Sequence, residues 1–128
     1  MDRSAPVRGG AMTALTPEAR TNALPGLLAT GWQATEGRDA IRKVWRFDDF
    51  AAAWGFMSRV ALLAERMDHH PEWTNRYNIV DVTLTTHDCG GLSELDIAMA
   101  RQIDRLAGST PVANAGAPTT CEERAARR

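Results

Sequence analysis

The amino-acid sequence predicts an α+β fold in which a four-stranded antiparallel sheet is covered on one face by three helices. Two patterns lead to this prediction. Apolar residues recur every three or four positions along residues 50–67, as in a helix, and apolar and polar residues alternate along residues 79–86, as in a half-buried strand. Turn residues separate the other segments. The expected order is therefore helix-strand-strand-helix-strand-strand-helix.

The first helix and the first hairpin are predicted from local signals. Thr16 is suited to cap a helix that begins at Pro17 and runs to about Ala29. Residues 32–35 and 40–47 predict two strands, because bulky apolar residues flank a polar, glycine-containing turn. We expect these two strands to pair as a hairpin.

The second helix is apolar around much of its circumference. It is expected to begin after Asp48 or Asp49, which can cap it, and to end near Asp68. Two adjacent rows of apolar residues run along it: Phe50, Trp54, Met57, Ala61 and Ala64, and then Ala53, Phe56, Val60, Leu63 and Met67. Such a helix is expected to pack on the sheet with one side and on a partner subunit with another.

The second half of the sheet and the last helix follow a proline. Pro71 is expected to end the preceding helix, and strands are predicted at residues 73–77 and 79–86. Ser93 and Asp96 have the spacing of a capping box, which predicts that the last helix begins there.

Composition limits the class of protein. We expect residues 1–12 to be a disordered extension, residues 13–107 a single domain, and residues 108–128 a disordered tail, with Met1 or Met12 as the true start. The formal net charge of −1 predicts no nucleic-acid partner, and no stretch reaches the roughly 20 apolar residues of a membrane span. Two widely spaced cysteines predict a reducing, cytoplasmic location.

All three histidines of the chain lie between residues 65 and 96, which makes this stretch the candidate site. His69 and His70 are adjacent at a predicted helix end, and His87 is at a predicted strand end. Histidine exchanges protons near neutral pH without further activation. We expect the three imidazoles to surround one cavity, with Glu65 one helical turn before His69.

Other interpretations of these residues remain open. A single histidine beside a proline is more often a cap or a surface residue than a catalyst. Three histidines and a carboxylate can hold zinc, but adjacent histidines at a helix end diverge, so the prediction is no metal. A Cys89 nucleophile beside His87 is a weaker alternative, because no oxyanion-hole signature accompanies it. Neither GxxxxGK[ST] nor GxGxxG occurs, so a nucleotide cofactor is not indicated.

Three motifs resemble one known family. Residues 37–41 read G-R-D-A-I, residues 68–73 read D-H-H-P-E-W, and residues 85–96 read T-T-H-D-C-G-G-L-S-E-L-D. Across residues 31–106 the chain strongly resembles the pterin-4a-carbinolamine dehydratases, especially the animal members, which also serve as a dimerisation cofactor for a homeodomain transcription factor.

The resemblance implies a hydro-lyase that dehydrates 4a-hydroxytetrahydrobiopterin to quinonoid dihydropterin. This reaction recycles tetrahydrobiopterin for an aromatic amino acid hydroxylase. The pterin is the substrate, and neither a metal nor a redox cofactor is used. The resemblance also implies a homodimer or homotetramer. The alternative function is a dimerising binding partner, of the transcriptional coactivator type, without significant catalysis.

The resemblance also implies which residues act. His69, His70 and His87 are the catalytic residues, with His70 and His87 expected to transfer protons and His69 to bind or orient the substrate. The substrate-binding set is Glu65, Asp68, His69, His70, Trp73, Thr85, Thr86, His87 and Asp88. Glu65 and Asp88 are candidates for fixing tautomers or for contacting the amidine edge of the pterin.

Overall fold

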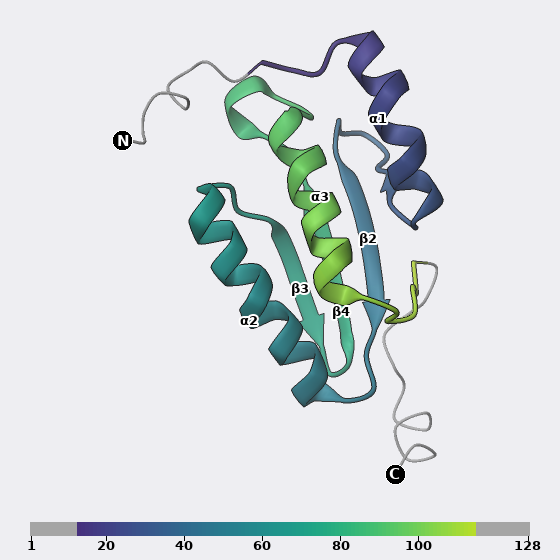
Figure 1. Ribbon diagram of the computed structural model, residues 1–128, viewed down its shortest axis with the longest axis vertical. Helices are drawn as coiled ribbons and strands as arrows, with labels where there is room; N and C mark the ends of the chain where they lie inside the picture. The colour runs from purple at the N-terminus through teal and green to yellow at the C-terminus, as the bar shows by residue number, and fades with distance from the viewer. Residues whose placement is uncertain (1–12, 115–128) are drawn as a thin grey trace.

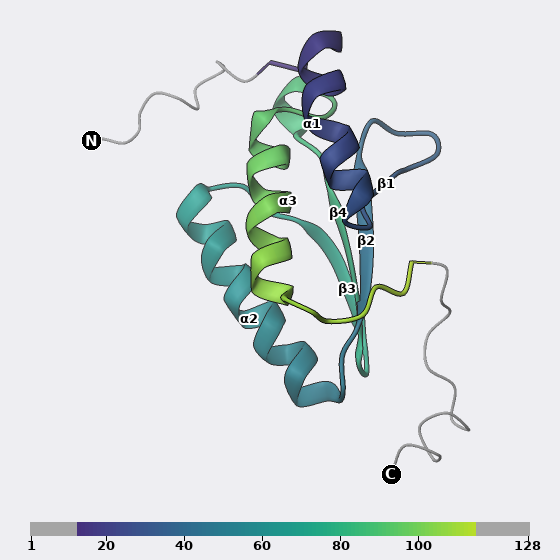
Figure 2. The same cartoon turned by 45° about the vertical axis from the view of Figure 1, so that its right-hand side comes forward.

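The computed structural model describes residues 13–114, and its elements follow the expected order (Figure 1). These elements are α1 (Pro17–Ala29), β1 (Gln33–Ala34), β2 (Ile41–Arg46), α2 (Phe50–Met67), β3 (Glu72–Arg76), β4 (Ile79–Leu84), the short 3-10 helix η1 (His87–Cys89) and α3 (Glu94–Ala107). The strands form one antiparallel sheet in the order β1-β2-β4-β3. Figure 2 shows the helices on one side of this sheet. The predicted α+β fold is therefore confirmed.

Strand register separates a core face from an open face. Ile41 pairs with Leu84 and Trp45 pairs with Val80, and all four side chains are buried beneath the helices. Because side chains alternate along a strand, the positions between them lie on the opposite face. The alternation predicted for residues 79–86 is confirmed as far as Leu84, where β4 ends.

Most of one apolar row of α2 lies in the core, whereas much of the other row does not. Asp49 caps the helix by accepting a hydrogen bond from the Ala52 backbone N–H at 2.8 Å. Ala53, Phe56, Val60 and Leu63 are buried. Phe50 and Trp54 from the other row stay 49% and 56% exposed, and their rings stack with centroids 6.2 Å apart. The helix thus has a second apolar surface that this chain does not cover.

A buried ion pair joins α3 to β2. The Lys43 ammonium lies 2.7 Å from Asp104 Oδ1, and the Lys43 side chain is almost entirely buried. Asp104 also accepts hydrogen bonds from Trp32 Nε1 at 3.0 Å and from the Thr30 hydroxyl at 2.7 Å. Because each charged group has a partner, the pair can be tolerated in this interior position.

Residues 108–114 correct the expectation of an unstructured tail from residue 108. The Arg46 N–H donates to the Pro111 carbonyl at 3.0 Å, and the Ala113 N–H donates to the Val44 carbonyl at 2.8 Å. The physical reason is that β1 is only two residues long, so it leaves the backbone of β2 unpaired beyond Ile41–Arg42. The segment 108–114 satisfies those groups.

The remaining tail expectations lie outside the described residues. Those expectations are the disorder predicted for residues 1–12 and for the last part of the chain, and the choice of Met12 as the start. Within residues 13–114, no helix is both long enough and apolar enough to cross a membrane.

Candidate active site

The candidate site lies where the end of α2, the start of β3, η1 and the start of α3 meet. Asp68 ends α2 in the left-handed conformation, with φ of 53°. The next residue, His69, turns inward and is only 8% exposed, and it contacts α3 through Asp96. His87 begins η1, rather than closing a strand as expected, and its ring faces Glu72 at the start of β3.

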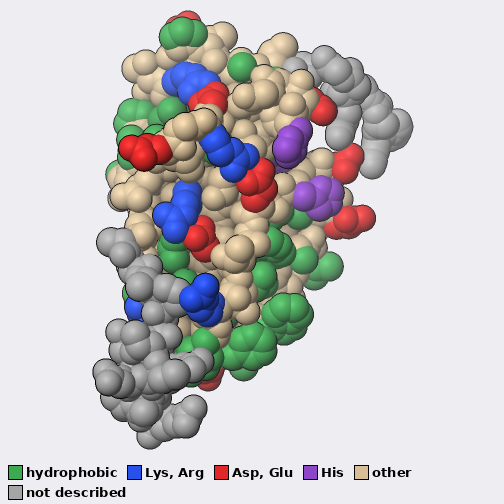
Figure 3. All heavy atoms as spheres, turned by 180° about the vertical axis from the view of Figure 1, so that it is seen from behind, with side chains coloured by type: hydrophobic (Ala, Val, Ile, Leu, Met, Phe, Trp, Pro, Cys, Tyr) green, Lys and Arg blue, Asp and Glu red, His purple; other side chains and the backbone are tan. Residues whose placement is uncertain are grey.

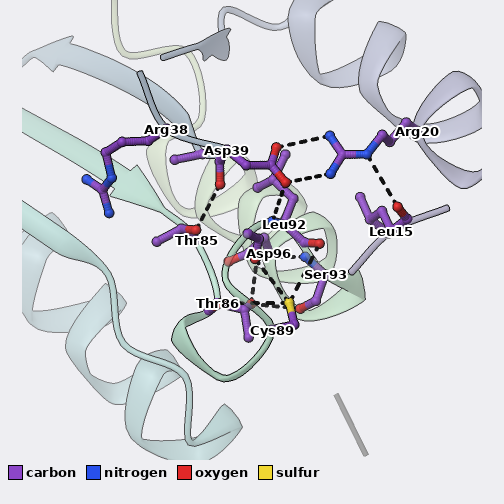
Figure 4. A network of polar contacts seen from close by, with 12 residues as sticks. Leu15, Arg20, Arg38, Asp39, Thr85, Thr86, Cys89, Leu92, Ser93 and Asp96 are labelled. Carbon is purple, nitrogen blue, oxygen red and sulfur yellow. Dashed lines mark hydrogen bonds and ion pairs between the residues drawn. The ribbon is translucent and has the colours of Figure 1, made fainter. Parts of the chain in front are cut away.

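Asp96 is the centre of a fully buried polar network. Its Oδ1 lies 2.6 Å from His69 Nε2, and its Oδ2 accepts the Thr86 hydroxyl at 2.7 Å and the Ser93 backbone N–H at 2.9 Å. Figure 4 shows Thr86, Ser93 and Asp96 meeting at the start of α3. A carboxylate can only accept hydrogen bonds, so with Asp96 as a carboxylate we assign the proton of the His69–Asp96 contact to Nε2. Asp96 therefore fixes the orientation and the tautomer of His69.

His70 and His87 have a different environment from His69. The His70 side chain is 60% exposed and its Nε2 lies 3.6 Å from Glu65 Oε1. The His87 side chain is 87% exposed and its Nε2 lies 3.8 Å from Glu72 Oε2. Figure 3 shows histidine side chains at the surface near acidic and basic groups, on the face opposite the helices. One imidazole is interior and two are exposed, so a single cavity lined by all three stays a prediction.

Glu72 was not among the predicted site residues, although it lies inside the D-H-H-P-E-W motif. It accepts two hydrogen bonds from Arg38, at 2.8 and 2.9 Å. These bonds hold the pKa of Glu72 below its usual range, and the charge of His87 adds a smaller effect in the same direction. A carboxylate thus lies beside His87, and its position depends on the turn between β1 and β2.

The loop that carries His87 is held by that same turn. The Thr85 hydroxyl donates to the Asp39 carbonyl at 2.9 Å, and the Leu92 N–H donates to Asp39 Oδ2 at 3.1 Å. Figure 4 shows Asp39 between Arg20 on one side and this loop on the other. Hydrogen bonds from Arg20 hold the pKa of Asp39 below its usual range, against the opposing effect of burial.

The other predicted residues are placed as follows. The Thr85 and Thr86 hydroxyls donate hydrogen bonds to Asp39 and Asp96, so these two residues support the site rather than face a ligand through their hydroxyls. Glu65, Asp68 and Asp88 are exposed around the histidines. Trp73 packs partly against the core.

A shallow hollow of about 280 Å³ lies next to the site on the open face of the sheet. It is lined by Arg42, Glu72, Trp73, Thr74, Asp81 and Thr83. Arg42 and Asp81 form a bidentate ion pair, with distances of 2.9 and 2.8 Å. These two charges neutralise each other, so the Arg42–Asp81 side of the hollow offers no unpaired charge.

The geometry also bears on the alternative roles of Cys89 as a nucleophile and of the histidines as metal ligands. The Cys89 thiol donates towards the Gly91 carbonyl, 3.3 Å away, rather than towards an imidazole. Among residues 13–114, no three His, Cys, Asp or Glu side chains are grouped as metal ligands would be.

Comparison with known proteins gives matches over nearly the whole described region. The family model for Pterin 4 alpha carbinolamine dehydratase matches residues 13–106. A relative from Jannaschia sp. is 54% identical over 93 residues, covering 73% of this chain and 95% of its own. One from Roseobacter denitrificans is 55% identical over 94 residues, covering 73% and 96%. Both carry the name "Putative pterin-4-alpha-carbinolamine dehydratase".

Two solved structures are similar as well. A crystal structure described as a transcriptional coactivator/pterin dehydratase from Brucella melitensis is 51% identical, with a TM-score of 0.70, and the match covers 75% of this chain and all of that one. A pterin dehydratase-like protein, identified as a RuBisCO assembly factor in the alpha-carboxysome, is 28% identical with a TM-score of 0.55, covering 62% and 92%.

Proposed function

The chain belongs to the pterin 4 alpha carbinolamine dehydratase family, and from this premise we propose that it dehydrates 4a-hydroxytetrahydrobiopterin to quinonoid dihydropterin. The observation that carries the proposal is the placement of His70 and His87. Each is exposed to solvent and lies within 4 Å of a carboxylate, at 3.6 Å for Glu65 and 3.8 Å for Glu72. Each can therefore exchange protons with both a substrate and water.

The reaction needs one proton donor and one proton acceptor. The hydroxyl oxygen on C4a takes up a proton as the C4a–O bond breaks, so that water leaves. N5 loses its proton as the C4a–N5 double bond forms. The dehydration needs no external oxidant or reductant, so proton transfer alone balances the step. General acid and base groups typically contribute about 10² to 10⁴ each in rate.

His70 and His87 take the proton-transfer roles in this proposal, and His69 takes the orienting role. His69 is buried and its Nε2 is bound to Asp96, so its fixed ring is suited to holding a substrate in one pose. The exposed carboxylates Glu65 and Asp88 are suited to the amidine edge of the pterin, which presents N–H donors. The reaction that supplies the substrate would be that of an aromatic amino acid hydroxylase.

The test is dehydration of the carbinolamine by purified variants. His70→Ala and His87→Ala should each slow the reaction by about 10²-fold or more, while the variants remain folded because both side chains are exposed. Arg101→Ala, an exposed residue on α3, serves as the control. Rates equal to the control for both histidine variants would overturn the proposal.

The exposed apolar surface of α2 supports self-association. Phe50 and Trp54 form a stacked, half-exposed pair, and Leu62 is 68% exposed on the same helix. Large exposed apolar side chains gathered together mark interaction sites, and Figure 3 shows hydrophobic side chains clustered along this edge. We propose that another copy of this chain covers the surface, so that α2 forms the interface of a homodimer or homotetramer.

Light scattering on a sizing column tests the oligomer. Trp54→Glu should shift the protein to a smaller species, whereas Leu28→Glu, at an equally exposed position on α1, should not. The alternative function, a dimerising binding module, is favoured by the same surface. It predicts that the histidine variants keep partner binding and that the wild-type protein has no dehydratase activity.

A further inference from the structure

We propose that Asp39, held by Arg20, is a positioning residue for His87. This inference rests on the proposed proton-transfer role of His87. The His87 ring is 87% exposed, so packing around the ring contributes little to its orientation. The backbone of its loop must therefore set where the ring lies.

Asp39 contacts both stems of that loop. A backbone bridge closes the loop, with the Thr86 N–H donating to the Gly91 carbonyl at 2.9 Å and the reverse bond at 3.2 Å. Immediately outside the bridge, Thr85 donates to the Asp39 carbonyl at 2.9 Å and Leu92 donates to the Asp39 carboxylate at 3.1 Å. One residue of the β1–β2 turn thus holds the chain on both sides of His87 (Figure 4).

Arg20 completes a closed ring of contacts around the second stem. Its Nη1 and Nη2 lie 3.0 and 2.5 Å from the two carboxylate oxygens of Asp39. Its Nε donates to the Leu15 carbonyl at 3.4 Å, and the Leu15 N–H donates to the Leu92 carbonyl at 2.9 Å. Leu92 is therefore fixed through both its N–H and its carbonyl, and Arg20 links the two anchors.

Gly91 shows how closely the carboxylate packs on the loop. A Cβ added at this glycine would lie 2.3 Å from Asp39 Oδ2, a distance that real contacts do not allow. The neighbouring turn residue, Arg38, holds Glu72, the carboxylate 3.8 Å from the His87 ring. Two adjacent turn residues thus fix the loop that carries the imidazole and the carboxylate beside it.

The test compares Asp39→Asn with Asp81→Asn. Both carboxylates form bidentate pairs with an arginine, both are partly exposed and both lie in or beside the sheet, but only the Asp39 carboxylate also accepts the Leu92 N–H of the loop, whereas that of Asp81 pairs with Arg42 of β2. Asp39→Asn should lower kcat about tenfold with KM changed less than about twofold, since misplaced catalytic groups mainly slow the chemical step. Asp81→Asn should leave both constants unchanged. Equal kcat in the two variants would overturn the inference.

A double-mutant cycle separates positioning from general destabilisation. In a His87→Ala background, Asp39→Asn should cause no further loss, because the residue acts through His87. The same tenfold loss in both backgrounds would show a merely structural role. Arg20→Ala combined with Asp39→Asn should be no slower than Asp39→Asn alone.

Amide hydrogen exchange gives an outcome that is independent of catalysis. Exchange at Gly91 and Leu92 should be at least about tenfold faster in Asp39→Asn than in Asp81→Asn, because local opening becomes easier. Unchanged exchange would refute the proposal that Asp39 holds the loop. If His87→Ala keeps full activity while exchange in Asp39→Asn is faster, the proposed function fails, but Asp39 still holds the loop.

Discussion

Replacing Asp96 by Asn tests the buried network by changing one atom in the carboxylate. Three donors converge on Asp96: Thr86 and Ser93 on Oδ2, and His69 on Oδ1. An asparagine has one oxygen and one NH₂ group. The Ser93 backbone N–H cannot accept a hydrogen bond, so the amide oxygen must take the Oδ2 position. The NH₂ group then faces His69, whose ring must move its proton from Nε2 to Nδ1 in order to accept.

The magnitude follows from the burial and the charge of the network. Hydrogen bonds to charged groups contribute about 1.5–3 kcal/mol, against about 0.5–1.5 kcal/mol for neutral ones. Asp96→Asn keeps three bonds but makes them neutral, and the amide costs less to bury. We expect a loss of about 2 kcal/mol in the free energy of unfolding, or about 10 °C in Tm for a domain of this size. Asp96→Ala leaves buried donors unsatisfied and should cost about 3–5 kcal/mol.

Two measurements check this prediction. Urea denaturation gives the loss of stability, with Glu94→Gln as the control, because Glu94 is an exposed acid in the same helical turn. Nitrogen-15 NMR of the imidazoles reports the tautomer of His69. The reasoning is refuted if Asp96→Asn is as stable as Glu94→Gln, or if His69 in that variant keeps its proton on Nε2.

Three further perturbations follow from contacts elsewhere in the fold. Gly91→Ala places a Cβ 2.3 Å from the Asp39 carboxylate and should cost about 1–3 kcal/mol in urea denaturation, and an unchanged midpoint would contradict this contact. The pKa of Asp39 is lower in the folded chain than its unfolded value of about 3.9, so its contribution to stability is present above about pH 4 and is lost as pH falls through the folded pKa. Tm measured from neutral to acidic pH should therefore fall less steeply in Arg20→Ala than in the wild type, and parallel curves would contradict the ion pair. Asp104→Ala leaves the buried Lys43 ammonium without its carboxylate and should lower the free energy of unfolding by about 3–5 kcal/mol. Lys43→Met should lower it less, because Asp104 reaches solvent. Equal losses in urea denaturation would contradict this reasoning.

Local signals predicted most of the elements. The start of α1 was predicted from Thr16 and Pro17, and the start of α3 from the capping box of Ser93 and Asp96, because each signal acts within one helical turn. The pairing of residues 108–114 with β2 was not predicted. It depends on unpaired backbone groups more than 60 residues away in the chain, which leave no mark in the composition of the segment.

The candidate site was predicted only as a set of residue types. Sequence spacing brought the three histidines together but did not show that His69 is interior and His70 exposed. That difference depends on the left-handed conformation of Asp68. Glu72 was not predicted because its hydrogen-bond partner, Arg38, lies in the distant β1–β2 turn. Asp96 was recognised only as a cap, since its contact with His69 spans 27 residues.

The buried ion pair of Lys43 has a practical consequence for labelling. Lys43 is the only lysine in the sequence, and in the fold its amine is enclosed beside Asp104 and 5.0 Å from the centre of the Trp45 ring. Amine-reactive probes therefore find no accessible side-chain target while the domain is closed. The rate of Lys43 acylation would therefore report how often the domain unfolds, and it can be followed by mass spectrometry.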